Sequence, residues 1–159
     1  MINLKSENEI FDSVWERVSG SPAPKAYDER GETEAFIRDE LADAAKYAYL
    51  ARMCGNTFAS RTLRRISADE ASHVRKLRTA YYLAYGESPS VKPGPVEKPA
   101  NLLGTLRRAY WEETEGEKRY REAAKRTGKE LYSELASDEA AHASELSRII
   151  SILLGGQPS

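Results

Sequence analysis

Both histidines of this chain follow a glutamate by three residues, within stretches of helical periodicity. The pairs are Glu70 with His73 and Glu139 with His142. Because residues three apart share one face of an α-helix, each pair directs a carboxylate and an imidazole at one point. Each pair also closes a related heptapeptide, Ser-Ala-Asp-Glu-Ala-Ser-His in the first case and Ala-Ser-Asp-Glu-Ala-Ala-His in the second. This internal repeat predicts an all-α bundle with pseudo-twofold symmetry.

Apolar residues recur at helical spacing along most of the chain. A short amphipathic helix is expected from Asn8 to Val18, before a linker rich in serine and proline. Four longer helices are expected at about 32–53, 59–85, 101–126 and 129–154, and each is followed by a glycine. We therefore expect three parts: a helix and linker over 1–31, a four-helix bundle over 32–154, and a tail over 155–159.

The connections between the four long helices determine the expected topology. Tight turns at Gly55 and Gly128 join the first helix to the second and the third to the fourth, so each pair is antiparallel. The middle segment, 87–100, carries four prolines and at about 3.1 Å per residue spans roughly 40 Å, the length of the bundle. A crossover there makes the second and third helices parallel, which is the topology of ferritin-like folds. The alternative is an up-and-down bundle with a flexible middle loop.

The two glutamate–histidine pairs fall on the apolar stripes of their helices. Leu63, Ile66 and Leu77 flank the first pair at heptad-like spacing, and Leu135 and Leu146 flank the second. Core histidines with one hydrogen bond each are the alternative, but they leave two buried glutamates unexplained. Because a buried carboxylate is costly unless it is paired or bound to metal, we interpret the four residues as metal ligands.

Two further glutamates are expected at the same level of the bundle. Glu40 lies on the stripe of the first long helix and Glu113 on that of the third. Each is followed seven residues later by a tyrosine, Tyr47 or Tyr120. Counted from the helix-ending turns, both glutamates lie near mid-bundle. The residues expected to converge there on two metal ions are Glu40, Glu70, His73, Glu113, Glu139 and His142.

These motifs resemble those of the rubrerythrin-like, ferritin-like di-iron proteins over about 32–154. The resemblance implies that Glu70 and Glu139 bridge the metals, that Glu40 and Glu113 are terminal ligands, and that one histidine binds each metal. Tyr47 and Tyr120 are expected to hydrogen-bond ligand carboxylates, although packing alone also accounts for them.

The resemblance extends to two aspartates that precede the motif glutamates. It implies that Asp69 contacts the outer ring nitrogen of His142 and that Asp138 contacts that of His73, which would orient both rings. Solvated helix residues are the alternative for both aspartates.

The chain departs from rubrerythrins in two respects. Its single cysteine, Cys54, excludes a rubredoxin-type iron site, and Gly116 stands where those proteins have an additional glutamate. Helical periodicity places Glu117 on the inner face and turns Glu112 and Glu115 towards solvent. We expect Glu117 to influence catalysis, with Tyr47 and Tyr120, without being required for metal binding.

The expected chemistry is redox chemistry at two iron ions, with manganese possible in the same ligands. Peroxide reduction or a reaction with dioxygen is expected, with electrons from a separate donor protein. The alternatives are iron oxidation and storage, a manganese catalase or hydroxylase, and a bundle that only mediates association.

Charge and hydropathy limit the partners of the chain. A net charge of −1 provides no basic patch for nucleic acid, and the longest apolar run, 149–154, is too short to span a membrane. The polar N-terminus is not a signal peptide, so we expect a cytoplasmic protein. A homodimer is expected by resemblance, and because the bundle does not need the N-terminal helix for closure.

Overall fold

The structure is a computed structural model that describes residues 27–95, 98–99 and 101–155, together with Glu9, Val14 and 16–19. These residues form helices and connecting segments, without strands. The four long helices are α2 (Glu29–Met53), α3 (Thr57–Tyr85), α4 (Leu102–Thr127) and α5 (Glu130–Leu153). The expected helix from Asn8 to Val18 lies largely outside the described residues, and the expected tail is described only at Gly155.

Side-chain caps set where α2, α3 and α4 begin. Asp28 accepts a hydrogen bond from the Gly31 backbone N–H at 2.9 Å, so α2 begins three residues earlier than periodicity predicts. Asn56 accepts one from Ala59 at 2.9 Å, which starts α3 two residues early. Asn101 caps α4 as expected. Periodicity therefore predicts the presence of the four helices correctly, but it predicts the first residues of α2 and α3 less accurately.

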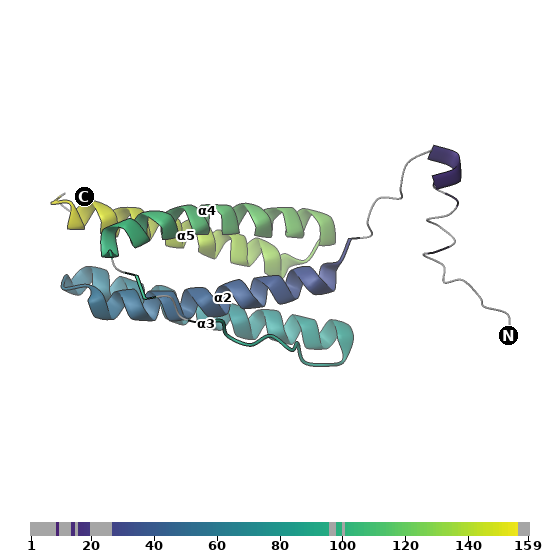
Figure 1. The fold of residues 1–159 in the computed structure, drawn as a ribbon, viewed down its shortest axis with the longest axis horizontal. Coiled ribbons are helices and arrows are strands. Elements are labelled where there is room, and N and C mark those ends of the chain that lie inside the picture. The colour runs from purple at the N-terminus through teal and green to yellow at the C-terminus, as the bar shows by residue number, and fades with distance from the viewer. Residues whose placement is uncertain are drawn as a thin grey trace.

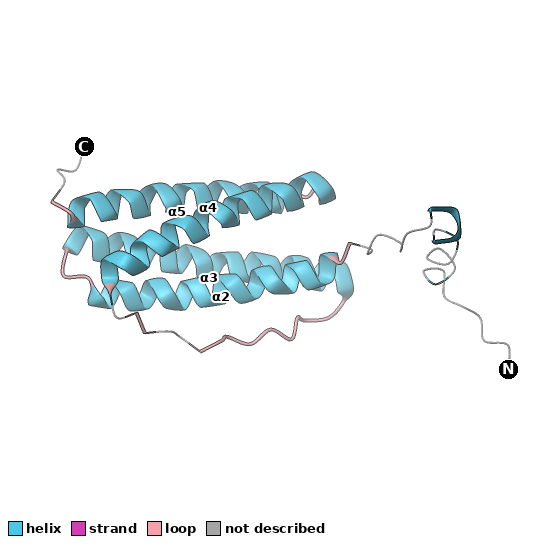
Figure 2. Ribbon diagram, turned by 45° about the horizontal axis from the view of Figure 1, so that its top comes forward, coloured by secondary structure: helices cyan, strands magenta, loops and turns pink. Residues whose placement is uncertain are grey.

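The four helices form two antiparallel pairs, α2 with α3 and α4 with α5, as Figure 1 shows. Gly86 ends α3 at φ 71°, in the left-handed region that favours glycine. From there the chain returns along the bundle to the start of α4 (Figure 2). Val91 in this segment is buried, and Arg78 donates a hydrogen bond to its carbonyl oxygen at 3.2 Å. The crossover makes α3 and α4 parallel, as the sequence predicts.

A buried polar layer divides the apolar core into two clusters. One cluster lies towards the α2–α3 turn and includes Leu50, Leu63, Ile66, Leu106, Leu146 and Ile149. The other lies towards the α4–α5 turn and includes Phe36, Ile37, Leu77, Tyr120, Tyr132 and Leu135. Along each of α2, α3, α4 and α5, a buried glutamate falls between residues of the two clusters. The apolar clusters therefore fix the four glutamates at one level of the bundle.

Short side chains allow α2 and α3 to approach closely. Ser67 donates a hydrogen bond to the Ala44 carbonyl oxygen and Ser60 donates one to that of Ala51, each at 2.7 Å. These bonds fix the register of the two helices between the polar layer and the α2–α3 turn. None of the described helices is sufficiently long and apolar to cross a membrane.

Candidate metal centre

The structure brings together the six residues that the sequence singles out as ligands. α2 and α4 each contribute a glutamate, and α3 and α5 each contribute a glutamate–histidine pair. All six side chains point into the bundle, and none is more than 5% exposed. They are Glu40, Glu70, His73, Glu113, Glu139 and His142.

Within this cluster the possible ligand atoms form two overlapping groups. The first contains Glu40, Glu70, His73 and Glu139, and the second contains Glu70, Glu113, Glu139 and His142. In each group the ligand atoms lie within 4.8 Å of one another, so each could hold a metal ion. The carboxylates that the two groups share come from opposite helix pairs, Glu70 on α3 and Glu139 on α5.

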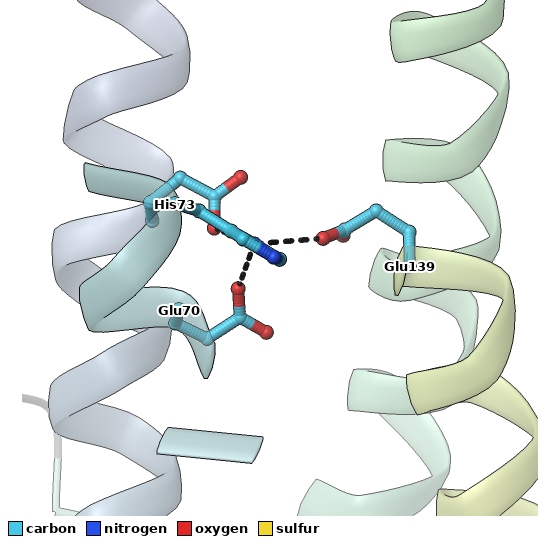
Figure 3. Close-up of side chains that lie close together, drawn as sticks. Glu70, His73 and Glu139 are labelled. Atoms are coloured by element: carbon cyan, nitrogen blue, oxygen red, sulfur yellow. Dashed lines mark hydrogen bonds and ion pairs between the residues drawn. The ribbon is translucent and has the colours of Figure 1, made fainter. Parts of the chain in front are cut away.

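His73 presents one ring nitrogen to the cluster and the other to the outside. Its Nδ1 lies 2.9 Å from Glu70 Oε2 and 3.6 Å from Glu139 Oε1, as Figure 3 shows. The same nitrogen is 3.3 Å from Glu40 Oε2. On the outer side, Nε2 lies 3.2 Å from Asp138 Oδ2, so the expected aspartate contact is present.

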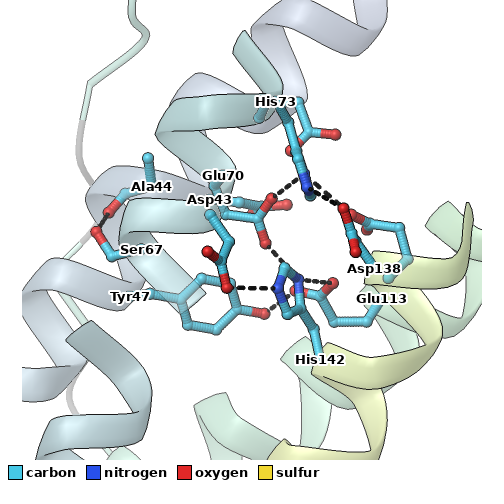
Figure 4. Close-up of polar contacts among 12 residues, drawn as sticks. Asp43, Ala44, Tyr47, Ser67, Glu70, His73, Glu113, Asp138 and His142 are labelled. Carbon is cyan, nitrogen blue, oxygen red and sulfur yellow. Dashed lines mark hydrogen bonds and ion pairs between the residues drawn. The ribbon is translucent and has the colours of Figure 1, made fainter. Parts of the chain in front are cut away.

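His142 repeats this arrangement from the other helix pair (Figure 4). Its Nδ1 lies 2.9 Å from Glu70 Oε1 and 3.5 Å from Glu113 Oε2. Its Nε2 faces Asp69 Oδ2 at 3.5 Å, which is the second expected aspartate contact. Because an aspartate occupies the outer nitrogen of each ring, Nδ1 is the nitrogen available to a metal.

Two tyrosines reach across the bundle to the outer carboxylates. Tyr47 on α2 donates a hydrogen bond to Glu113, and Tyr120 on α4 donates one to Glu40. Burial raises the pKa of both phenols well above the usual value, and the charge of each partner carboxylate raises it further. Both hydroxyl groups therefore stay protonated and act as donors, as the sequence predicts.

Several buried polar atoms of the cluster lack a hydrogen-bond partner among the described residues. They are both carboxylate oxygens of Glu70, Oε2 of Glu113, Oε1 of Glu139 and Nδ1 of His142. Such atoms carry a substantial desolvation cost when nothing binds them. Their lone pairs converge on the two groups described above, which is what a bound cation requires.

The environment of the cluster favours the protonated forms of several of its groups. Burial raises the pKa of Glu139 to about 12, with repulsion from Glu113 and Glu40 adding to the shift. Burial also raises the pKa of Glu70 to about 7, although the two adjacent histidine rings oppose the increase.

The two histidines show the opposite balance. Burial disfavours their charged forms, but the surrounding glutamates outweigh it and raise the pKa of His73 and of His142 to about 10. At Glu40 burial favours the neutral carboxyl group, but His73 and Glu70 beside it outweigh burial and lower the pKa of Glu40. The cluster therefore attracts positive charge strongly.

Glu117 belongs to neither group. Its carboxylate accepts a hydrogen bond from Arg121 Nε at 2.8 Å, one helical turn further along α4, and the side chain remains 28% exposed. Glu112 and Glu115 point towards solvent, as periodicity predicts. The structure therefore does not bring Glu117 to the cluster, although helical periodicity places it on the inner face.

Sequence reasoning missed Asp43 and Lys46 beside the cluster. Asp43 lies three residues after Glu40, and burial raises its pKa to about 6 while Lys46 opposes the shift. Lys46 Nζ lies 2.5 Å from Asp43 Oδ1 and 2.7 Å from Glu112 Oε2, which ties α2 to α4. The same three-residue spacing that revealed the histidine motifs could have identified Asp43.

Comparisons with known proteins support the fold and assign no family. No protein-family profile matches the chain, and no curated protein matches it in sequence. Among solved structures, a hypothetical protein from Pyrococcus furiosus is similar, with a TM-score of 0.70 at 19% identity. The similarity covers 81% of this chain and 92% of that one. It shows a shared helical architecture and nothing about the chemistry of the site.

Proposed function

We propose that this chain is a ferritin-like, di-metal redox protein of the rubrerythrin type, with iron as its metal. One observation carries the proposal: two buried ligand groups share Glu70 and Glu139, and each has its own glutamate and histidine. Ferritin-like di-iron and di-manganese proteins use this donor set, one glutamate from each of two helices and Glu-x-x-His from each of the others.

The residues present fit two divalent cations in both charge and donor type. Four carboxylates balance two divalent ions, which leaves both histidines neutral and able to coordinate through Nδ1. The bound ions would also satisfy the carboxylate oxygens that otherwise lack partners. A bundle built only for packing gains nothing from burying these groups, because apolar side chains fill a core at lower cost.

The surrounding residues hold the donors in place. Asp138 and Asp69 fix the ring orientation of the two histidines, and Tyr47 and Tyr120 fix the two outer carboxylates. When bound, the two metal ions would supply the electrons that reduce a substrate and the open positions at which it binds. The apolar clusters restrict access of water from the two ends of the bundle.

Peroxide is the proposed oxidant, with electrons delivered by a separate donor protein. The resemblance to rubrerythrin-like motifs supports this assignment over dioxygen. Reduction of the oxygen–oxygen bond consumes two electrons and two protons, and the chain itself contains no second redox cofactor site among its described residues. An external carrier is therefore part of the proposal.

The test combines metal analysis with turnover. Protein purified from iron-supplemented cells should contain about two metal ions per chain, and should consume hydrogen peroxide when a reductant is supplied. The double variant H73A/H142A should lose both properties, whereas Glu134→Ala, on the exposed surface of α5, should lose neither. A ratio near one metal ion per chain, or metal retained without either histidine, contradicts the proposed centre.

A further inference from the structure

A surface cavity of about 580 Å³ opens between α2 and α4 and reaches the carboxylate cluster. Glu40 and Glu139 lie in its wall, together with Tyr120, so it connects the surface to the candidate metal centre. Hydrogen peroxide needs only a narrow passage, whereas cavities of this size generally hold organic molecules. The volume therefore exceeds what the smallest peroxide requires.

Gly116 keeps the inner end of this cavity open. A Cβ atom at this position of α4 would lie 2.6 Å from Glu139 Oε2, closer than side chains normally approach. Any other residue would therefore displace the Glu139 carboxylate or close the passage beside it. On α2, the position three residues after Glu40 carries Asp43, whereas the corresponding position after Glu113 is Gly116. The two halves of the bundle differ here, and both residues line the same cavity.

The lining disfavours an anionic molecule, because its carboxylates outnumber its cationic side chains. Its apolar part comes from both helices and from the crossover, and includes Phe36, Ala42, Ala45, Pro95, Pro99 and Tyr120. Three cationic side chains also line the described part of the cavity, and a carboxylate already contacts each of them. The pairs are Lys46 with Asp43, Arg108 with Glu112, and Arg119 with Asp39. No cation there is left to bind an anionic group, so organic anions are disfavoured.

We propose that this cavity binds the organic group of a neutral organic hydroperoxide and places its peroxide group beside Glu139. The inference rests on the proposed peroxide reduction and names its substrate class. In the overall reaction, the hydroperoxide gains two electrons and two protons, its oxygen–oxygen bond breaks, and an alcohol and water form. The electrons come from the electron-donor protein of the proposed function, or from dithionite in the assays below.

Binding is tested without turnover, on protein loaded with redox-inert zinc. The probe is 2-phenyl-2-propanol, the alcohol formed from cumene hydroperoxide, and benzoate serves as the anionic comparison. We expect amide chemical-shift changes at Gly116 and Ala45 with the alcohol and none with benzoate. Gly116→Ala should abolish these changes at Ala45. Gly104→Ala is the matched control on the same helix, because its Cβ would make only ordinary contact, at 3.5 Å from Asn101.

Turnover then tests specificity through the ratio of kcat/KM for cumene hydroperoxide to that for hydrogen peroxide. Gly116→Ala should lower this ratio by roughly tenfold or more, and Gly104→Ala should leave it unchanged. Ala45 lines the cavity from α2 and belongs to neither ligand group, so Ala45→Leu should lower the ratio even if Gly116→Ala disturbs metal content.

The outcomes separate this inference from the proposed function. If the protein consumes hydrogen peroxide and neither cavity variant changes the ratio, the cavity is not a substrate site and the metal centre stands. If the protein consumes no peroxide of either kind, the proposed function fails, and the substrate assignment fails with it. Shifts that are equal for benzoate and the alcohol, or absent for both, likewise overturn the assignment.

Discussion

The hydroxyl group of Tyr47 on α2 donates a hydrogen bond to the carboxylate of Glu113 on α4. Tyr120 on α4 returns the same contact to Glu40 on α2. The two bonds are related by the pseudo-twofold symmetry that also relates the histidine motifs. Together they join the two helix pairs at the level of the carboxylates. A shift of one pair along the bundle axis would move its ligands away from those of the other pair.

Removing either tyrosine hydroxyl should destabilise the metal-free protein. Tyr47→Phe leaves a Glu113 oxygen buried without a partner, and Tyr120→Phe does the same to Glu40, so each should cost about 1–3 kcal/mol in the free energy of unfolding. Tyr132→Phe is the control, because its hydroxyl group contacts the neutral Thr33 hydroxyl at 3.0 Å. Urea unfolding after chelator treatment measures all three. If Tyr47→Phe lowers the free energy of unfolding no more than Tyr132→Phe does, the hydrogen bond to Glu113 does not stabilise the protein.

The aspartates outside the two histidines should control metal affinity rather than fold. Asp138→Ala removes the contact to His73 Nε2, which frees the ring to rotate, and should weaken metal binding by roughly 10–100-fold. Glu134→Ala is the matched control, because Glu134 also lies on the exposed surface of α5 but contacts Lys76 instead of a histidine. Competition with a calibrated chelator gives both affinities. Equal affinities in the two variants would show that Asp138 is a solvated residue.

Much of the polar layer could be predicted because helical geometry links sequence spacing to position. The three-residue spacing of Glu70 and His73 fixes a shared face, and glycine stops set the height of each glutamate in the bundle. The helix starts were less accurate because Asp28 and Asn56, the residues that cap α2 and α3, precede the apolar pattern. The capping residue determines where a helix begins, and hydrophobic periodicity alone does not reveal that position.

The surroundings of the layer could not be predicted in the same way. An angle of about 100° per residue places Glu117 near the inner face, but Arg121 one turn later provides a partner outside the cluster. The space beside Gly116 depends on the separation of α2 and α4, which no single helix encodes. Side-chain pairing within α4 decides the first feature, and the packing of α2 against α4 decides the second.

Helix α4 offers a direct comparison of the two glutamates. Glu113→Ala removes a buried member of the second ligand group and should eliminate metal binding there. Glu117→Ala removes only the contact to Arg121, so we expect metal content and peroxide turnover to stay as in the wild type. Metal analysis and a peroxide assay with reductant test both variants. Slow turnover in Glu117→Ala with full metal content would show that this residue acts at the site despite its pairing.

Raising the pH should destabilise the metal-free protein. Burial raises the pKa of Glu139 from 4.5 to about 12, so the folded chain keeps a proton that the unfolded chain releases. His73 and His142, whose pKa values rise from 6.5 to about 10, stabilise the fold fully below pH 6.5 and lose that contribution as the pH rises. Both effects lower the free energy of unfolding between about pH 6 and pH 9. Glu40, whose pKa is lowered, contributes constantly across this range because its effect is lost only at more acidic pH.

Metal binding should show the reverse dependence, because the ions replace these protons. As the pH rises, fewer protons compete at Glu139 and the two histidines, so metal affinity increases and protons are released on binding. Calorimetry in buffers of different ionisation enthalpy counts those protons, and urea unfolding with and without metal gives the two stability profiles. Glu139→Gln, which keeps the shape of the side chain without its titration, should flatten the metal-free profile. Parallel profiles with and without metal would mean that the ions bind elsewhere, because only ligands in the buried layer exchange protons for metal.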